Sequence, residues 1–477
     1  MKTTNFSFWL AVIALTLGLN ITAYSQSDNT LFWLRSVPQI KKFNPAMLPN
    51  AKFFLGLPVV SSVWVGVRNT GFAFGDFYRK DNLGDYYWDH DNMLSKLSAR
   101  NYFDADTGID IFSMGFNIGK GFLSIGIHEN LYTKFTYPKD LMLLISKGVN
   151  YFDSNNIVPD FVNSEIGAMH FREYVLGYSF PISERLNFGL SLKAVQGLGK
   201  FDFIARRLDL TQGVKGNYLL DAELELNFAF PFKLGPFETL GDNFENDFDP
   251  KDYLIGLRNF GAAIDIGLVY KPTEMLSIGL SAINLGFINW SSGIENFRLS
   301  GQTDFQGIEF NNSGNEEGAT SGSAFKEIRD ALSNAFDVSS TNTTMRQSIP
   351  TRLYASVGLH LGKVQTIGLV SRTIVFEGNL NPSLTFSYNL TPINAIGLAV
   401  SYTVVDKAPS HFGAGFNLNL GPLQVYAVSD NASGALDPAA IQTINARLGL
   451  NFVFGNRHKK KPSEPSREHN FFLPPRE

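Results

Sequence analysis

Apolar and polar residues alternate with a period of two along many stretches of this chain, for example at 186–194, 396–404 and 412–420. Such alternation predicts β-strands with one apolar face. The opposite face carries mostly Gly, Ser, Asn and Thr, whereas a soluble β-sandwich usually presents charged side chains to water. Small polar residues suit the interior of a barrel that has lipid around its apolar face. The pattern therefore predicts an all-β chain that folds as a transmembrane antiparallel β-barrel.

The last alternating stretch, 444–454, ends on the aromatic residue Phe454. An amphipathic final strand that ends on an aromatic residue resembles the C-terminal signal of outer-membrane proteins. The chain departs from that pattern in one respect, because 23 residues follow Phe454. The stretch nevertheless favours a barrel in the bacterial outer membrane.

Short turns between the alternating runs indicate the number of strands. We place these turns at 119–121, 181–184, 271–274, 362–363, 390–393 and 421–422. Strands that run toward the periplasm are expected at 109–118, 170–180, 259–270, 351–361, 382–390, 411–420 and 441–454. Strands that run outward are expected at 62–76, 122–134, 186–203, 275–289, 364–377, 394–405 and 423–429. About fourteen strands result, and this even number places both chain ends in the periplasm.

Long outer connections separate several of these strands. The stretches 218–228 and 296–310 are predicted to extend strands or to form hairpins above the membrane, because spanning strands there would put neighbouring short turns on opposite sides. Two pieces, 139–151 and 323–336, show helical periodicity. Their apolar residues are candidates for capturing a hydrophobic ligand, and these are Leu141, Leu144, Ile145, Phe325, Ile328, Leu332 and Phe336.

The two ends of the chain differ from the barrel pattern. Lys2, an apolar run to Leu19 and the small residues before Gln26 predict a signal peptide at 1–25. Residues 26–60 are expected to form an N-terminal periplasmic or plug segment, and 61–456 the barrel. The tail 457–477 is Pro-rich, holds six Lys or Arg against three Glu, and is predicted to be disordered. Its residues Lys459, Lys460 and Lys461 are candidate contacts for peptidoglycan, a periplasmic protein or lipid headgroups.

Composition removes several kinds of chemistry. The chain has no cysteine, which excludes disulfides, thiolate metal sites and a cysteine nucleophile. A net charge of −4 gives no support for a nucleic-acid partner. His90 lies between Asp89 and Asp91, and 242–252 is rich in acids, but neither stretch has the spacing of an established metal site. No nucleophile or acid–base pattern is present, so we expect no enzyme and no cofactor.

A barrel of fourteen strands encloses a lumen too wide for wall side chains alone to fill, so a plug is expected. The segment "KKFNPAMLPN" at 41–50 is available for it. Asn44 suits a helix N-cap, Pro45 the first helical position, and Pro49 a stop, which predicts a single helical turn. Asn44, Pro45, Ala46, Met47 and Leu48 are therefore the plug candidates.

The stretches "FNPAMLPNAKFFLGLP", "AIDIGLVYKPTEMLSIGLSAINLGFINW" and "GPLQVYAVSDN" carry a resemblance to known barrels. The chain resembles the long-chain fatty-acid transporter FadL family and PorV-type barrels of the type IX secretion system. It is most similar to a Bacteroidetes family of outer-membrane proteins of unknown function. The FadL resemblance implies that the N-terminal segment plugs the barrel and that outer-loop helices capture an apolar ligand. The pre-barrel segment here is shorter than the one in the FadL family.

Three functional hypotheses follow from these features. The first is a plugged outer-membrane barrel that binds or transports a hydrophobic small molecule and contacts membrane lipid. The second is a non-transporting barrel, similar to the PorV type, that binds a partner in secretion or surface assembly. The third is a soluble exported β protein, which extraction in plain buffer would reveal.

Overall fold

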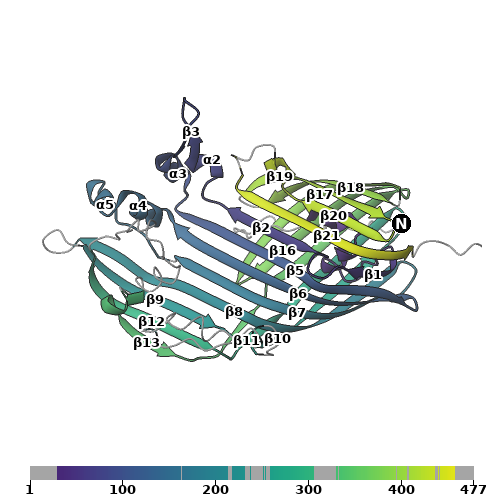
Figure 1. Cartoon of the computed structure of the whole chain (residues 1–477), viewed down its shortest axis with the longest axis horizontal. Coiled ribbons are helices and arrows are strands. Elements are labelled where there is room, and N and C mark those ends of the chain that lie inside the picture. The colour runs from purple at the N-terminus through teal and green to yellow at the C-terminus, as the bar shows by residue number, and fades with distance from the viewer. Residues whose placement is uncertain are drawn as a thin grey trace, which may run out of the picture.

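The computed structural model describes residues 29–162, 164–212, 218–230, 237, 251, 253, 258–305, 329–330, 332–393, 395–405, 408–435, 439 and 441–456. One antiparallel sheet closes on itself as a barrel of fourteen strands, which confirms the predicted fold (Figure 1). The first strand position is shared by β1 (Ala51–Gly56) and β2 (Val63–Asn69). The other thirteen are β5 (Arg100–Ile118), β6 (Gly121–Pro138), β7 (Glu165–Pro181), β8 (Leu186–Gln212), β10 (Phe260–Tyr270), β11 (Leu276–Trp290), β15 (Thr351–Leu361), β16 (Gln365–Phe376), β17 (Asn379–Ile393), β18 (Ile396–Val405), β19 (Ala408–Leu420), β20 (Leu423–Ser429) and β21 (Thr443–Asn456).

Closure of the barrel depends on its first strand position. Both β1 and β2 pair with β5 on one side and with β21 on the other, so the first and last strands of the chain meet. Each remaining strand pairs antiparallel with its neighbour in sequence, except that β10 pairs directly with β8 and β11 with β15. Of the segments skipped at these two places, 218–229, 294–305 and 337–341 form the outer sheet described below, whereas 345–348 pairs with the end of β11.

The wall begins at Ala51, ten residues before the expected barrel boundary. Gly56 lies opposite Asn451 and Val63 opposite Leu448, so residues 57–62 form a large bulge. Pro58 cannot donate a ladder hydrogen bond, which is why the alternating pattern starts only after it. The bulge stays tied to β21, because Leu57 N donates to the Leu450 carbonyl (3.1 Å) and Leu450 N donates to the Val60 carbonyl (2.9 Å).

The outer face of the wall is apolar. Large side chains alternate outward along each strand, as Leu398, Val400, Tyr402 and Val404 do on β18, where the intervening residues are buried. An apolar surface of this extent on a closed barrel is the arrangement that lipid contact requires. No helix within the described part of the chain is long and apolar enough to cross a membrane.

One end of the barrel carries long connections with their own secondary structure (Figure 1). The end of β8 continues beyond the wall and pairs with β9 (Tyr218–Ala229), which pairs with β12 (Ile294–Phe305), which pairs with β13 (Asp337–Thr341). The predicted strand extensions at 218–228 and 296–310 are therefore present, and 306–310 lies outside the described residues. The other elements at this end are α2 (Phe74–Phe77), β3 (Tyr78–Lys80), β4 (Tyr86–Trp88), α3 (His90–Lys96), α4 (Lys139–Lys147), α5 (Asn150–Ser154) and β14 (Met345–Ser348).

Candidate functional site

The segment from Asn29 to Asn50 lies inside the barrel at the end with the short turns (Figure 1). It folds as two 3₁₀ helices, η1 (Asn29–Trp33) and η2 (Pro38–Lys42), followed by a turn. Met47 N donates to the Asn44 carbonyl (3.0 Å), and Ala46 N donates to the Asn44 side-chain oxygen (2.9 Å). Asn44 therefore caps a single turn that contains Pro45, at the place where the sequence predicts one helical turn. We call residues 29–50 the plug.

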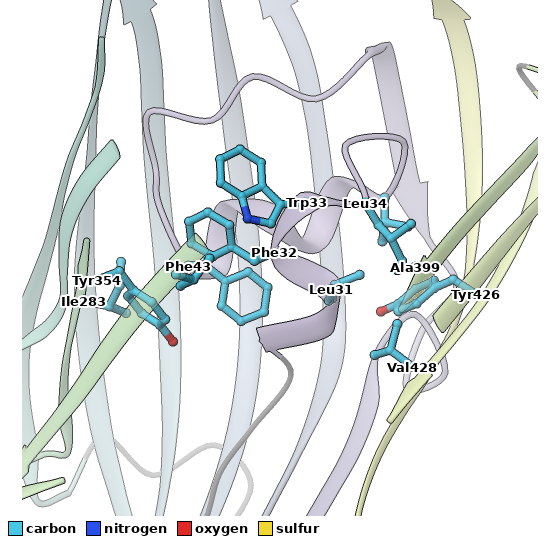
Figure 2. Close-up of a cluster of buried hydrophobic side chains, with 12 residues drawn as sticks. Leu31, Phe32, Trp33, Leu34, Phe43, Ile283, Tyr354, Ala399, Tyr426 and Val428 are labelled. Atoms are coloured by element: carbon cyan, nitrogen blue, oxygen red, sulfur yellow. The ribbon is translucent and has the colours of Figure 1, made fainter. Parts of the chain in front are cut away.

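The plug has an aromatic core that contacts both sides of the wall. Figure 2 shows Leu31, Phe32, Trp33, Leu34 and Phe43 of the plug between Ile283 and Tyr354 on one side and Ala399, Tyr426 and Val428 on the other. The ring centroids of Phe32 and Trp33 lie 5.2 Å apart in an edge-on arrangement, and Phe43 meets the edge of Tyr354 at 5.9 Å. This packing replaces a solvent-filled lumen with a dry core at the level of the plug.

Glycines on the inner face of the wall make room for the plug. A side chain at Gly358 or Gly368 would overlap the indole ring of Trp33. A side chain at Gly189 or Gly267 would overlap the turn at Asn44 and Pro45 in the same way. The sequence predicts that small inward residues line the barrel interior. At this level they leave the space that the plug occupies, and we call Gly189, Gly267, Gly358 and Gly368 the glycine seat.

Hydrogen bonds fix the plug around most of the circumference. Asn44 is 1% exposed, and its Nδ2 donates to the Leu268 carbonyl (3.1 Å) and the Leu280 carbonyl (3.2 Å) on adjacent strands. Further hydrogen bonds join the plug to six other strands. The wall partners are His360 on β15, Thr385 on β17, Ser401 on β18, Asn417 on β19, Gln424 on β20 and Asn451 on β21. Bonds this widely distributed oppose movement of the plug as a whole.

The N-terminal turn of the plug is held by one carboxylate. Asn29 N and Thr30 N each donate to the Asp430 carboxylate at 2.8 Å, and the Thr30 hydroxyl bonds to it as well. All three residues are fully buried. A buried carboxylate that accepts several N–H and O–H donors is well compensated for the loss of water.

Two basic side chains on the plug point toward the wall. Lys42 pairs with Asp110 of β5, which also bonds to His128 Nδ1 at 2.8 Å. Burial lowers the pKa of the Lys42 ammonium, and the nearby Arg447 lowers it further, although Asp110 acts in the opposite direction. Lys41 donates to the Ser179 hydroxyl of β7.

The opposite side of the plug, which faces the short turns, also carries positive charge. Burial lowers the pKa of Arg35 to about 10. The pKa of Lys271, in the turn after β10, is lowered by burial and by Arg35. Ala46, Met47 and Leu48 line a cavity of about 80 Å³ on this side. The structure thus brings all five predicted plug residues into the lumen.

A layer of charged side chains lies directly above the plug, on its outer side. Lys193 of β8 contacts the carboxylates of Glu173 (3.3 Å) and Asp265 (3.0 Å), and all three are at least 90% buried. Arg352 of β15 donates to the Tyr132 hydroxyl of β6 at 2.5 Å, which joins opposite sides of the barrel. We call the group of Asp110, His128, Glu173, Lys193, Asp265, Arg352 and Arg447 the charged layer.

A cavity of about 100 Å³ lies between the plug and the charged layer. Its lining combines Lys42 and Gln39 of the plug with Asp110, Glu173 and Arg352 of the wall. Small inward residues around it, namely Gly108, Ser113, Ser124, Gly126 and Ser191, leave this space open. This cavity is a part of the described lumen in which a small ligand would meet several polar groups at once.

An apolar cluster follows the charged layer toward the outer end. Phe171, Val195 and Trp290 are fully buried in it, and Tyr132 stacks on Phe171 with centroids 5.8 Å apart. Phe171 lies two residues beyond Glu173 on β7, and Val195 lies two residues beyond Lys193 on β8. Inward positions two residues apart on a strand are separated by about 7 Å. Charged and apolar surfaces therefore adjoin inside the barrel.

The predicted capture residues of the first helix lie on α4, at the outer end. Leu141 and Leu144 pack against a cluster that includes Met93, Leu143 and Phe152, whereas Ile145 is 48% exposed. The apolar face of α4 thus packs mainly against α3, α5 and the end of β6, in a cluster that also holds Leu210 and Tyr218 of the outer sheet, and Ile145 is the member open to solvent.

The second set of capture residues lies in another cluster on the same outer sheet. Leu332 and Phe336 pack with Phe297 and Leu299 of β12. Both outer clusters share Leu208 and Leu220, so they form one continuous apolar region. Phe325 and Ile328 lie outside the described residues, as do the predicted signal peptide 1–25 and the tail with Lys459, Lys460 and Lys461.

The acidic stretch around His90 has a structural role. Asp89 accepts the backbone N–H of Asn92 at the start of α3 and pairs with Arg79 at 2.9 Å. The backbone bond, followed by the Arg79 contact, lowers the pKa of the Asp89 carboxyl. The structure as described holds no group of three His, Asp or Glu side chains suited to a metal ion. Most of 242–252 lies outside it.

The charged layer is the functional feature that the sequence analysis missed. Lys193 and Arg447 are visible in the alternating pattern as inward positions, yet they are averaged with the Gly, Ser and Asn around them. The available signal was a charged residue at an inward position of each of several neighbouring strands, with two more on β5 at Asp104 and Asp106. Recognising it requires the strand register, which aligns these positions at one height.

Comparisons with known proteins give distant structural similarities. The chain is similar to a TodX deltaS2S3 mutant monoaromatic hydrocarbon channel (9% identity, TM-score 0.44, 91% of this chain and 96% of that chain). It is also similar to a Pseudomonas aeruginosa FadL homologue (11%, 0.43, 92% and 100%) and to the P. putida toluene transporter TodX (9%, 0.41, 91% and 96%). No curated protein matches the chain. A family model described as a family of unknown function matches residues 45–430, which is most of the chain, so the protein belongs to the DUF5723 family.

Proposed function

We propose that this protein is an outer-membrane barrel that binds a small amphipathic molecule in the lumen above its plug and passes it toward the periplasm. The observation that carries the proposal is the contact between the charged layer and the apolar cluster, beside a cavity of about 100 Å³. The apolar outer face of the closed wall supports placement in the membrane. Export by the segment 1–25 belongs to the same proposal.

The two adjoining surfaces suit a molecule with a polar end and an apolar end. Glu173, Lys193 and Arg352 would meet the polar end beside the plug. Phe171 and Val195, about 7 Å further out, would meet the apolar end. Ligand sites typically combine an apolar lining with a few convergent polar groups.

Capture at the outer end is the first step of this proposal. The continuous apolar region of the two outer clusters includes Leu141, Leu144, Leu332 and Phe336, and Ile145 beside it is exposed. Exposed apolar side chains next to such a region would hold the apolar part of the molecule before it enters the barrel.

A matched pair of substitutions tests whether binding takes place in the lumen. Val175 lines the cavity on β7, whereas its neighbour Leu176 is 52% exposed on the outer face. We expect Val175→Phe to reduce binding at least about tenfold by filling the cavity, and Leu176→Phe to leave binding unchanged. Native mass spectrometry of the full chain in nanodiscs, with 1-decanoylglycerol, decanoate and decylammonium, measures this. Equal binding by both variants would contradict the proposal.

A second function is favoured by the way the plug is held. Its buried bonds to strands from β5 to β21 suit a permanently closed barrel that binds a protein partner, as PorV-type barrels are expected to do. Proteoliposome uptake of the three probes separates the two functions. Uptake supports transport, whereas no uptake together with a retained protein partner supports the alternative. A pull-down with residues 457–477 deleted then shows whether Lys459, Lys460 and Lys461 contribute to that partner contact.

A further inference from the structure

The lining of the cavity above the plug has unused hydrogen-bonding capacity of a particular kind. Within the described lumen, Asp110 Oδ2 and Glu173 Oε1 have no hydrogen-bond partner in the protein. Asp110 is 1% exposed and Glu173 is 4% exposed, and both line the cavity. Asn130 Nδ2, which also lines it, is an unpartnered donor. A ligand group that donates to two acceptors and accepts from one donor would satisfy all three atoms.

A cationic group is a poor fit for these atoms despite the two carboxylates. Lys42 and Lys193 already contact Asp110 and Glu173. Arg352 and Arg447 line the same cavity. Like charges repel strongly at short range in a buried site, so a further ammonium among four cations would be destabilised.

An anionic group fits no better. Lys42 and Lys193 are engaged by carboxylates, Arg352 donates to Tyr132, and Arg447 donates to the Ser62 hydroxyl (2.5 Å). An anion would instead face the two free carboxylate oxygens, which offer it no donor. Both repulsion and the loss of water would act against it.

A pair of neutral hydroxyl groups meets every requirement, because each donates one hydrogen bond and can also accept one. The cavity volume of about 100 Å³ corresponds to roughly three water molecules at about 30 Å³ each. This space suits a head group of about the size of glycerol. We infer that the polar end recognised by this lumen is a small neutral polyol, held by Asp110, Glu173 and Asn130. The inference rests on the proposed binding of an amphipathic molecule and names its head group.

The three probes used above differ in their head groups, and each carries one unbranched ten-carbon chain. The inference predicts that 1-decanoylglycerol binds the full chain in nanodiscs at least about tenfold more tightly than decanoate or decylammonium. It also predicts that Val175→Phe removes this preference. Suppose that decanoate or decylammonium binds as tightly as 1-decanoylglycerol or more tightly, and that Val175→Phe abolishes this binding. That result would overturn the inference and leave the proposed function intact. If no probe depends on Val175, the proposed function itself fails.

A second variant separates recognition from folding. Glu173→Gln keeps the size of the side chain and replaces the carboxylate, so we expect about tenfold weaker binding of 1-decanoylglycerol, as for the loss of a hydrogen bond to a charged group. Glu129→Gln is the matched control, because Glu129 pairs with Arg172 on strands β6 and β7 away from the cavity. Heat-modifiable gel mobility confirms that both variants are folded. Unchanged binding in folded Glu173→Gln would show that water alone occupies the cavity at this carboxylate, and would overturn the inference.

Discussion

Two neighbouring levels of the same lumen are lined by very different residues. At the level of the plug, the strands present glycines such as Gly358 and Gly368 and short polar side chains that bond to the plug backbone. One level further out, they present charged side chains, of which Glu173 and Lys193 are buried and Arg352 is half-buried. The first level is filled by a second piece of the same chain, and the second level retains a cavity.

This difference shows what each kind of inward residue indicates. Inward glycines at the level of the plug mark places where the plug comes close to the wall, so no side chain can be added there without displacing the plug. Inward ion pairs mark a place where long side chains span the lumen and where polar groups remain available to a ligand. Substitutions at the two levels should therefore fail in different ways.

The largest effect is expected at the glycine seat. Gly358→Leu places a side chain where Trp33 lies, and overpacking of this kind costs about 3 kcal/mol or more. Urea unfolding in lipid bilayers, read by gel mobility, measures the change. Ala355→Leu on the outer face of the same strand is the control and should shift stability by less than about 0.5 kcal/mol. Similar effects of both substitutions would mean that the plug is not seated against this glycine.

Loss of the ion pair between plug and wall should come next. Lys42→Met leaves the buried Asp110 carboxylate with His128 as its remaining charged neighbour, and breaking a buried pair in this way costs about 3 kcal/mol. The same unfolding assay measures it. Adding Asp110→Asn should recover part of the loss, because the uncompensated charge is then gone. A double variant no more stable than Lys42→Met would contradict this explanation.

A smaller effect is expected for the capped turn. Asn44→Ala removes two hydrogen bonds to wall carbonyls and one within the turn, and should cost about 2 kcal/mol. Asn44→Asp keeps the oxygen that caps the turn but loses the donor. If Asn44→Asp is as stable as the unsubstituted chain, the bonds to the wall contribute little and the turn alone matters.

The smallest effects are expected at the outer clusters, which lie away from both levels. Leu144→Ser should lower protection of the outer sheet from hydrogen exchange by about 1 kcal/mol, because Leu144 packs in the cluster. Ile145→Ser should change it by less than about 0.5 kcal/mol, since that side chain is largely exposed. If Ile145 takes part in capture, Ile145→Ser should slow uptake of the three probes into proteoliposomes more than Leu144→Ser does. An unchanged uptake rate in Ile145→Ser would remove this residue from the proposed function.

The sequence predicts the wall well because a strand with lipid on one side alternates strictly. The fourteen wall positions follow from this pattern and from the turn lengths, as do β9 and β12 of the outer sheet, whereas β13 does not. The β1 segment escapes prediction because Pro58 interrupts the pattern and the bulge at 57–62 follows. The turn at Asn44 is predictable from local capping, since it depends on residues close in sequence.

The candidate site is less predictable because it depends on register. Asp110, Glu173, Lys193 and Arg352 lie on four strands that are far apart in sequence. Glu173, Lys193 and Arg352 stand among uncharged inward residues, whereas Asp110 follows the inward Asp104 and Asp106 on β5, so no local pattern shows which charges meet at one level. The packing of Leu141 and Leu144 is equally hard to predict, because their cluster joins the neighbouring helices α3 and α5 to Leu210 and Tyr218 of the outer sheet, which lie far along the chain.

The most direct test of this account is an experimental structure of the full chain in nanodiscs, prepared with 1-decanoylglycerol. The account predicts elongated density in the lumen above a seated plug, with one end beside Asp110 and Glu173 and the other against Phe171 and Val195. Density for separate waters alone in the cavity, with the amphiphile absent or bound only on the outer wall, would contradict it.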